Sequence, residues 1–362
     1  MPQTNVRPGK GYEVREHLGS GRWKDVYRAV QRRDWRDVAL LRFKDTPSIE
    51  KLLAELRPLQ ALQGKRAENI AQLYGAFKGD DDHTYLVQEL MYRSLDNISP
   101  LGNIARFIEI ARGLFGGLAE FHELGLVHKD IKLENCGIDF LERAKLFDLG
   151  SGSSDSSHSL GSVLTRAPEL FQGGSVSYTT QADVWALGAT LLALRSGRYP
   201  FASSSDWKNR PPADKKGQPS RAHFEKLVCE RALKKTAGDG VSSLIADAFP
   251  DQLKSIMDRL LSFSPTNRPT ARDARDEWAR LLEDWFSPST PRLENEDTAV
   301  VLELEQYLDN VAKRRIGMSP RQWNLTLETF TGLSLAKGGQ VVTKVSELME
   351  KVRELRVAGT LS

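Results

Sequence analysis

The chain has 362 residues, enough for a two-lobed domain and a further small unit. Hydrophobic residues make up 40% and charged residues 27%, which excludes a disordered or fibrous protein. The net charge of +3 gives no reason to expect nucleic acid or a membrane as a partner, and two cysteines, Cys136 and Cys229, argue against a disulfide framework and predict a reducing, cytoplasmic location.

Residues 1–11 are expected to be an extension, and the pattern is β-like from residue 12 to residue 41. A glycine-rich turn, Leu18-Gly19-Ser20-Gly21-Arg22-Trp23-Lys24-Asp25-Val26, separates two of the predicted strands. Because Gly19 and Gly21 have no Cβ, backbone amides at this turn can approach phosphate oxygens closely. Taken alone, the G-x-G sequence is equally typical of a plain hairpin turn.

Two helices and a strand are predicted next. Apolar residues recur at helical spacing between residues 48 and 62, a segment that contains Glu55 and that Pro58 is expected to bend. Residues 85–87 form an apolar strand that leads into Gln88-Glu89-Leu90-Met91. Residues 107–124 then have the pattern of an amphipathic helix.

The most informative segment follows that helix. It reads His128-Lys129-Asp130-Ile131-Lys132-Leu133-Glu134-Asn135, and Asp148-Leu149-Gly150 comes shortly after it. Phosphoryl transfer needs one carboxylate to orient the attacking hydroxyl, and an amide and a second carboxylate to hold magnesium. Asp130, Asn135 and Asp148 stand at the spacings that this chemistry uses. A chance run of charges on a solvated loop is the competing interpretation, which the motifs downstream weaken.

Hydroxyl side chains then accumulate before Ala167-Pro168-Glu169. A run of this composition can be a flexible linker, but here D-L-G and A-P-E bracket it. The family resemblance given below implies that this run is an activation loop with phosphorylatable side chains. They are Ser151, Ser153, Ser154, Ser156, Ser157, Ser159, Ser162 and Thr165.

The remaining segments complete the domain organisation. Residues 184–194 are apolar but too short to span a bilayer, so we expect a buried helix there. Residues 202–221 are expected to form an exposed loop and residues 287–297 a linker. Residues 298–362 show three helical stripes, which predict a small helical C-terminal module. Its helices could simply pack on the large lobe, or serve a regulatory partner or self-association.

Together these motifs resemble the protein kinase superfamily, whose catalytic loop is H-R-D-x-K-x-x-N and whose metal motif is D-F-G. The resemblance covers residues 12–286 and implies an α+β, bilobal fold. A small β-rich lobe with one helix would occupy residues 12–91, and a large, mainly helical lobe would occupy residues 92–286. ATP and Mg²⁺ are implied, as are protein substrates that accept phosphate on Ser or Thr.

The resemblance also implies roles for individual residues. Asp130 would be the catalytic base, Lys132 would neutralise the transferred phosphate, and Asn135 and Asp148 would hold the metal. Glu55 would pair with the phosphate-binding lysine. The implied scaffold residues are Asp183, which anchors the catalytic loop, and the ion pair of Glu169 with Arg268. The implied ATP contacts are Leu18, Gly19, Gly21, Lys24, Val26, Ala39 and the backbone of Glu89 and Met91.

Two departures from the family pattern occur together. Lys24 replaces the third glycine of G-x-G-x-x-G, and Leu41 stands where the phosphate-binding lysine belongs. This arrangement resembles the with-no-lysine (WNK) kinases, which also have D-L-G, and it implies that Lys24 supplies the missing charge. Arg42 and Lys44 are competing candidates, but strand alternation predicts that both face away from the side of Leu41. A solvated Lys24 in a decayed pseudokinase is the plain alternative.

Two further replacements affect the large lobe. Lys129 replaces the arginine of H-R-D and could pair with an activation-loop phosphate, although without a bidentate fork. Gly137 replaces a leucine that lies beneath adenine in the family, which predicts a roomier pocket. We expect an active Ser/Thr protein kinase that phosphorylates its own activation loop. The alternatives are a pseudokinase scaffold and, less in keeping with A-P-E and Arg268, a small-molecule kinase.

Overall fold

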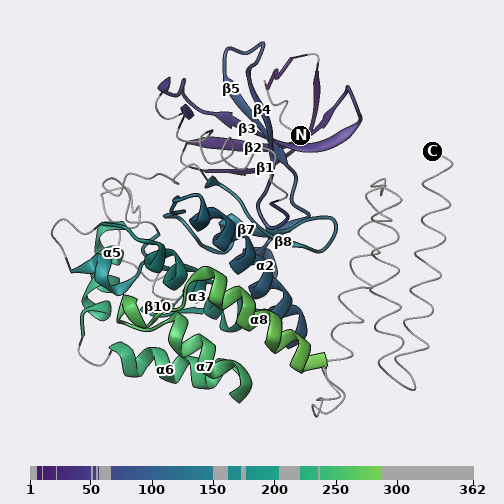
Figure 1. Ribbon diagram of the computed structural model, residues 1–362. Helices are drawn as coiled ribbons and strands as arrows, with labels where there is room; N and C mark the ends of the chain where they lie inside the picture. Colours follow the sequence, from purple (N-terminus) through teal and green to yellow (C-terminus); the bar gives the residue numbers. More distant parts are fainter. Residues whose placement is uncertain are drawn as a thin grey trace. The chain divides into compact units, whose positions relative to one another are not determined.

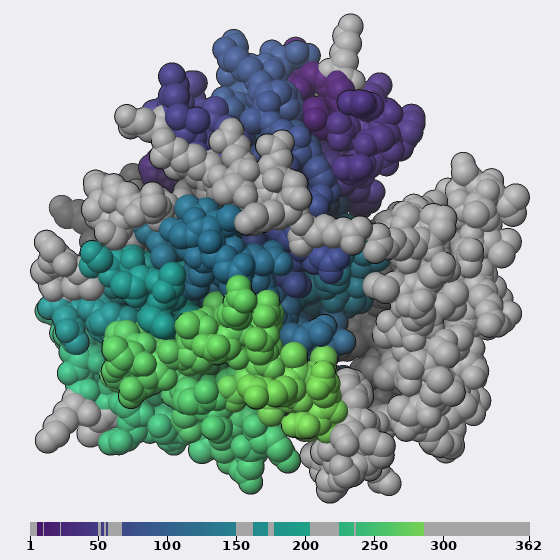
Figure 2. Space-filling model, in the orientation of Figure 1, coloured from purple at the N-terminus to yellow at the C-terminus, as the bar shows by residue number. Residues whose placement is uncertain are grey.

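The computed structural model describes residues 6–9, 11–21, 23–49, 52–53, 56, 67–149, 162–172, 177–203, 221–234 and 237–286. Within them an antiparallel sheet is followed by a mainly helical region, shown by the purple-to-blue strands and the teal-to-green helices of Figure 1. The same division is seen in the space-filling view of Figure 2. The predicted α+β class, with a β-rich first lobe and a helical second lobe, is confirmed.

The first lobe is a five-stranded sheet in the order β1-β2-β3-β5-β4. Every neighbouring pair is antiparallel, as expected for strands joined by short turns. The strands predicted between residues 12 and 41 and at residues 85–87 are therefore confirmed. Their bounds are β1 Tyr12–Ser20, β2 Lys24–Gln31, β3 Arg36–Phe43, β4 Leu73–Lys78 and β5 Thr84–Glu89.

The register of this sheet decides which side chains share a face. Lys24 lies opposite Phe43, and Val26 lies opposite Leu41. Directly paired residues of adjacent strands point to the same side of a sheet. Lys24 therefore shares the face on which Leu41, Phe43 and Ala39 form an apolar cluster. The other face carries a second cluster that includes Tyr27, Leu40 and Tyr85.

The second lobe is built around α3 (Thr180–Ser196), in which every residue from Ala182 to Leu194 is buried. The helices predicted at residues 107–124 and 184–194 are confirmed. Gly197 ends α3 with a φ of 69°, a conformation that favours glycine. The other helices are α2 Ile104–Glu123, α5 Arg221–Ala232, α6 Ala237–Ala248, α7 Asp251–Leu260 and α8 Ala271–Phe286.

Short strands lie before and between these helices. The expectation of an exposed loop at residues 202–221 is wrong at its start, where Ala202 is buried and pairs with Tyr199. The aromatic packing of Phe201 on Trp185 draws this end of the segment inward. The short strands are β6 Arg93–Ser94, β7 Cys136–Ile138, β8 Ala144–Leu146, β9 Arg198–Tyr199 and β10 Ala202–Ser203.

Several predictions fall outside the described residues. These are the role of Glu55, the seryl side chains from residue 151 to residue 159, the linker at 287–297 and the module at 298–362. All the described site residues belong to one compact unit made of Met1–Pro100 and Ile110–Leu281. Among the helices that the structure describes, none has the length and apolarity to cross a membrane.

Arg268 ties the lobe together from a fully buried position. Its guanidinium donates to both carboxylate oxygens of Glu169, at 2.7 and 2.8 Å, and to the carbonyls of Ser262 and Gln181. It also lies 5.0 Å from the ring centroid of Trp185. The structure thus places Glu169 and Arg268 in the predicted pair. The nitrogen donors of Arg268 are used by the carboxylate and the two carbonyls, and its guanidinium lies over the Trp185 ring.

Loss of this cation should destabilise the fold. We expect Arg268→Met to lower the free energy of unfolding by about 3 to 5 kcal/mol, because Glu169 would keep a charge without its partner. Urea denaturation measures the change. The control is Arg198→Met, since Arg198 and Asp247 are both mostly exposed and lie 3.7 Å apart. That variant should change stability by less than about 1 kcal/mol, and equal losses in both variants would contradict the account.

Candidate active site

The backbone of the catalytic loop is held by a buried carboxylate. Asp183 of α3 is fully buried, and its Oδ2 and Oδ1 accept hydrogen bonds from the amides of His128 at 2.7 Å and Lys129 at 3.0 Å. His122 Nε2 lies 3.0 Å from Asp183 Oδ2. Lys129 has a φ of 68°, a strained value for this residue type that these bonds hold in place. Asp183 therefore occupies the anchoring position that the sequence predicted.

Two predicted residues converge on the carboxylate of a third, Asp130, in this loop. Lys132 Nζ donates to Asp130 Oδ2 at 2.8 Å, and Asn135 Nδ2 donates to the same oxygen at 3.0 Å and to the Asp130 carbonyl at 2.8 Å. Burial lowers the pKa of Lys132, but the Asp130 carboxylate outweighs it, so this pKa lies above its ordinary value. Lys132 is thus a cation at neutral pH, beside the proposed base.

Asp148 meets Lys24 across the two lobes. Lys24 Nζ lies 3.0 Å from Asp148 Oδ1, and the lysine side chain is only 12% exposed. Burial raises the pKa of Asp148, but the charge and hydrogen bond of Lys24, helped by His128 and Lys132, hold it below its ordinary value. Leu149 is buried beside Ile70 and Phe121, which fixes the segment next to the carboxylate. Asp148 is therefore ionised at neutral pH.

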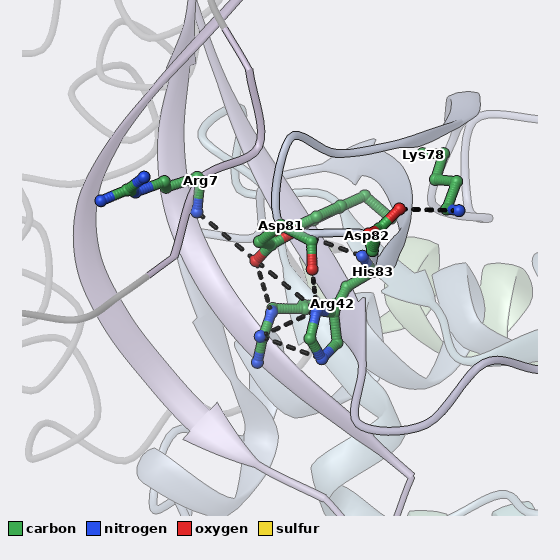
Figure 3. A network of polar contacts seen from close by, with 7 residues as sticks. Arg7, Arg42, Lys78, Asp81, Asp82 and His83 are labelled. Carbon is green, nitrogen blue, oxygen red and sulfur yellow. Dashed lines mark hydrogen bonds and ion pairs between the residues drawn. The ribbon is translucent and has the colours of Figure 1, made fainter.

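The competing cation Arg42 lies in a network on the opposite face of the sheet (Figure 3). Its Nε is 3.1 Å from Asp81 Oδ2, and its Nη2 is 3.0 Å from ring nitrogens of His83. The hydroxyl of Tyr85 donates to the same Asp81 oxygen at 2.8 Å, and the Arg7 amide does so at 3.4 Å. Arg42 is thus placed away from Asp148.

Lys44, the other competing cation, pairs with Asp25 at a distance of 3.4 Å. The Asp25 Oδ1 also accepts a 2.7 Å hydrogen bond from the hydroxyl of Ser20 in the glycine-rich turn. The turn is closed by the Gly21 amide, which donates to the Lys24 carbonyl at 2.8 Å. These bonds hold the start of β2, from which Lys24 projects. Among the predicted ATP contacts, Leu18 is exposed, Ala39 belongs to the apolar cluster beside Lys24, and Val26 packs against that cluster.

The predicted hinge is tied to both lobes. The Glu89 amide donates to the Gln72 carbonyl at 2.8 Å, and its carboxylate accepts a 2.8 Å bond from Lys145 Nζ. Lys145 is a buried cation in β8, and Asp139 lies 3.7 Å from the same nitrogen. Met91 comes two residues after Glu89 in the sequence. The sequence analysis missed Lys145, for which the available signal was one lysine within an apolar strand.

The described end of the activation segment contacts the catalytic loop. Thr165 is buried, and its hydroxyl donates to the Ile131 carbonyl at 2.7 Å. The Thr165 amide bonds to the Ser162 carbonyl at 3.2 Å. In this conformation Thr165 holds the segment against the loop, so phosphorylation of its hydroxyl would require this bond to break. Ser162 is half-buried.

Asn135 and Asp148 fit the requirements of a magnesium site. Among the residues described, no three His, Cys, Asp or Glu side chains form a group that could hold a metal ion alone. Mg²⁺ does not need such a group, because it uses one or two carboxylates together with waters and substrate phosphates. The amide nitrogen of Asn135 donates to Asp130, so its amide oxygen is the atom that could bind the metal. Asp148 adds an ionised carboxylate.

The sequence is similar to that of known proteins over most of its length. The family model for the protein kinase domain matches residues 12–278. The chain belongs to the protein kinase family. Human serine/threonine-protein kinase ULK3 is 32% identical over 216 residues, which are 54% of this chain and 43% of that kinase. The chain thus spans less than half the length of ULK3.

Two kinase relatives align over a larger share of both chains. Mitogen-activated protein kinase pmk-1 of Caenorhabditis elegans is 27% identical over 278 residues, 72% of this chain and 73% of that protein. Extracellular signal-regulated kinase 2 of Dictyostelium discoideum is 28% identical over 295 residues, 73% of this chain and 77% of that protein. All three relatives are kinases by name.

Proposed function

We propose that this protein is a serine/threonine protein kinase that transfers the γ-phosphate of ATP, with Mg²⁺, to hydroxyl groups of protein substrates. The observation that carries the proposal is the convergence of Lys132 and Asn135 on Asp130, together with the ion pair of Asp148 with Lys24. The free thiols Cys136 and Cys229 accord with a cytoplasmic location, which we include in the proposal.

Each residue of the site has a distinct task in this reaction. The substrate hydroxyl oxygen forms a bond to the γ-phosphorus while the bond from that phosphorus to the bridging oxygen breaks, releasing ADP. Asp130 orients the hydroxyl and accepts its proton. Lys132 stabilises negative charge on the transferred group from a position 2.8 Å from Asp130. Magnesium, held by Asn135 and Asp148 when bound, would neutralise charge on the phosphates.

We assign the phosphate-binding charge to Lys24. Its support is the placement of the ammonium group, which lies on the Leu41 face of the sheet and reaches Asp148 at 3.0 Å. Arg42 and Lys44 are engaged by Asp81 and Asp25 instead. A lysine at position 41 would start from the same face one strand away, so either strand can supply a cation to this region. The assignment also accounts for the apolar Leu41.

The alternative is a pseudokinase that binds nucleotide or a partner without efficient transfer. It predicts that at least one group needed for transfer is misplaced. The described residues Asp130, Lys132 and Asn135 instead form one contact network, and Asp148 pairs with Lys24, which favours the enzyme. We extend the proposal to autophosphorylation between Ser151 and Thr165, where the sequence is rich in hydroxyls.

Asp130→Ala and Asp148→Ala should each abolish transfer while the protein stays folded. The first removes the group that orients the hydroxyl, and the second removes a magnesium ligand, so ADP binding should survive better in the first. Transfer of labelled γ-phosphate to the protein itself and to a generic protein measures the effect, and mass spectrometry locates the phosphate. Asp247→Asn, an exposed carboxylate in α6, is the control.

The enzyme proposal would fail if folded Asp148→Ala transferred phosphate at the wild-type rate. Absence of transfer by the wild-type protein with magnesium would instead favour the pseudokinase. Phosphate found only outside residues 151–165 would count against autophosphorylation of the activation loop, but not against kinase activity.

Lys24→Met should lower the rate of transfer by on the order of 100-fold or more, because a cation aimed at the phosphates is lost. Arg42→Met and Lys44→Met are the matched controls, and each should keep the rate per folded molecule close to wild type. Arg42→Met is expected to lower stability, since Asp81 loses its partner, so the folded fraction is measured by circular dichroism.

A double variant tests whether position or charge matters at this site. Lys24→Gly combined with Leu41→Lys should recover part of the activity lost in Lys24→Gly, because residue 41 lies on the same sheet face. A Lys24→Met protein with wild-type turnover would overturn the assignment, as would loss of turnover in folded Arg42→Met.

A further inference from the structure

An aromatic ring fills the space left by Gly137. A Cβ atom added to Gly137 would lie 2.9 Å from Cε1 of Phe147, 2.9 Å from the Arg93 carbonyl oxygen and 3.2 Å from Cγ of Met91. Two of these distances are shorter than a carbon atom tolerates. The ring of Phe147 and the hinge can therefore come this close only because residue 137 is glycine. The roomier pocket expected from the sequence is wrong, since Phe147 occupies that room.

The ring stands between the two ends of the proposed nucleotide site. Phe147 directly precedes Asp148, and its amide donates to the Asn135 carbonyl at 3.0 Å. Met91, whose Cγ also lies near the Cβ position of Gly137, belongs to the predicted hinge. A nucleotide whose phosphates lie at Asp148 and whose base reaches the hinge must pass over this position. Phe147 is only partly buried.

We propose that Phe147 is a specificity-determining residue that forms an aromatic floor for the purine base, with Gly137 providing the space for its ring. The proposal rests on the nucleotide-dependent function proposed above, and it adds Phe147 as the residue that recognises the base. An aliphatic side chain at this place offers apolar contact, whereas a phenyl ring also offers a flat π-face for offset stacking. Stacking of a base on an aromatic ring depends little on hydrogen-bond pattern, so the floor would favour large, flat bases.

The test measures binding of ADP with magnesium by isothermal titration calorimetry, which does not need catalysis. Phe147→Leu keeps apolar bulk but removes the π-face, and it should weaken ADP binding roughly fivefold to tenfold. Phe147→Tyr keeps the ring and should retain wild-type affinity within about twofold. Gly137→Ala should weaken ADP binding, because its added methyl group displaces the ring. Thermal melting reports whether each variant is folded.

Phe77→Leu is the matched control. Phe77 of β4 is half-buried like Phe147, but it packs on the cluster of the opposite sheet face, where its ring lies 5.2 Å from that of Tyr85. This variant should bind ADP as the wild-type protein does. Unchanged ADP affinity in folded Phe147→Leu would overturn the aromatic floor, as would equal losses in Phe147→Leu and Phe147→Tyr.

The outcomes separate this inference from the kinase proposal. A wild-type protein that binds ADP but transfers no phosphate would end the kinase proposal and leave the floor to be decided by the Phe147 variants. A wild-type protein that does not bind ADP with magnesium would overturn both.

Discussion

The ion pair between Lys24 and Asp148, 3.0 Å long, joins the sheet of the first lobe to the metal motif of the second. It brings a cation from β2 to the place where the phosphates of a nucleotide would meet the metal. The pair also keeps Asp148 ionised against the cost of its burial. Within a partly buried site such a charge is worth more than on the surface, because less water screens it. The proposed chemistry depends on this placement.

At two positions where this chain departs from the family pattern, a neighbouring residue places a side chain close to the altered position. The apolar Leu41 is accompanied by Lys24 on the same face of the sheet, one strand away. The missing side chain at Gly137 is accompanied by the ring of Phe147. In the proposed assignment, Lys24 supplies the charge that Leu41 lacks, and Phe147 supplies the bulk that Gly137 lacks. This pattern fits a working site better than a decaying one, since decay gives no reason for paired changes.

Sequence alone predicted the elements whose signal is local. Strands β1, β2 and β3 follow from the β-like pattern around Gly19 and Gly21, β5 follows from its apolar run, and the buried helix α3 follows from its apolar residues, whereas β4 was not predicted. The placement of Lys24 and Arg42 on opposite faces follows from the same alternation, and the structure agrees with it. Within one loop, spacing predicted that Asp130 and Asn135 serve one site, and the family resemblance added Lys132, but the contacts of Lys132 and Asn135 with Asp130 are seen only in the structure.

The contacts that sequence analysis missed join distant segments. Lys145 and Glu89 are 56 residues apart, and neither carries a local sign that it pairs with the other. Phe147 looked like an ordinary apolar residue before Asp148, because its importance depends on the absent Cβ of Gly137 in another strand. Thr165 was predicted as a phosphorylatable side chain, yet its hydroxyl bonds the Ile131 carbonyl, 34 residues away. Such pairings are set by tertiary packing and not by residue spacing.

The most direct test of the role of Lys24 is a crystal structure of the protein with magnesium and a non-hydrolysable ATP analogue. The account predicts that Lys24 Nζ lies within hydrogen-bonding distance of a phosphate oxygen, at roughly 2.7 to 3.2 Å, and that Asp148 contacts the metal. Arg42 should remain with Asp81 on the opposite face of the sheet. A bound nucleotide whose phosphates are contacted by Arg42 or Lys44, with Lys24 turned to solvent, would contradict the account.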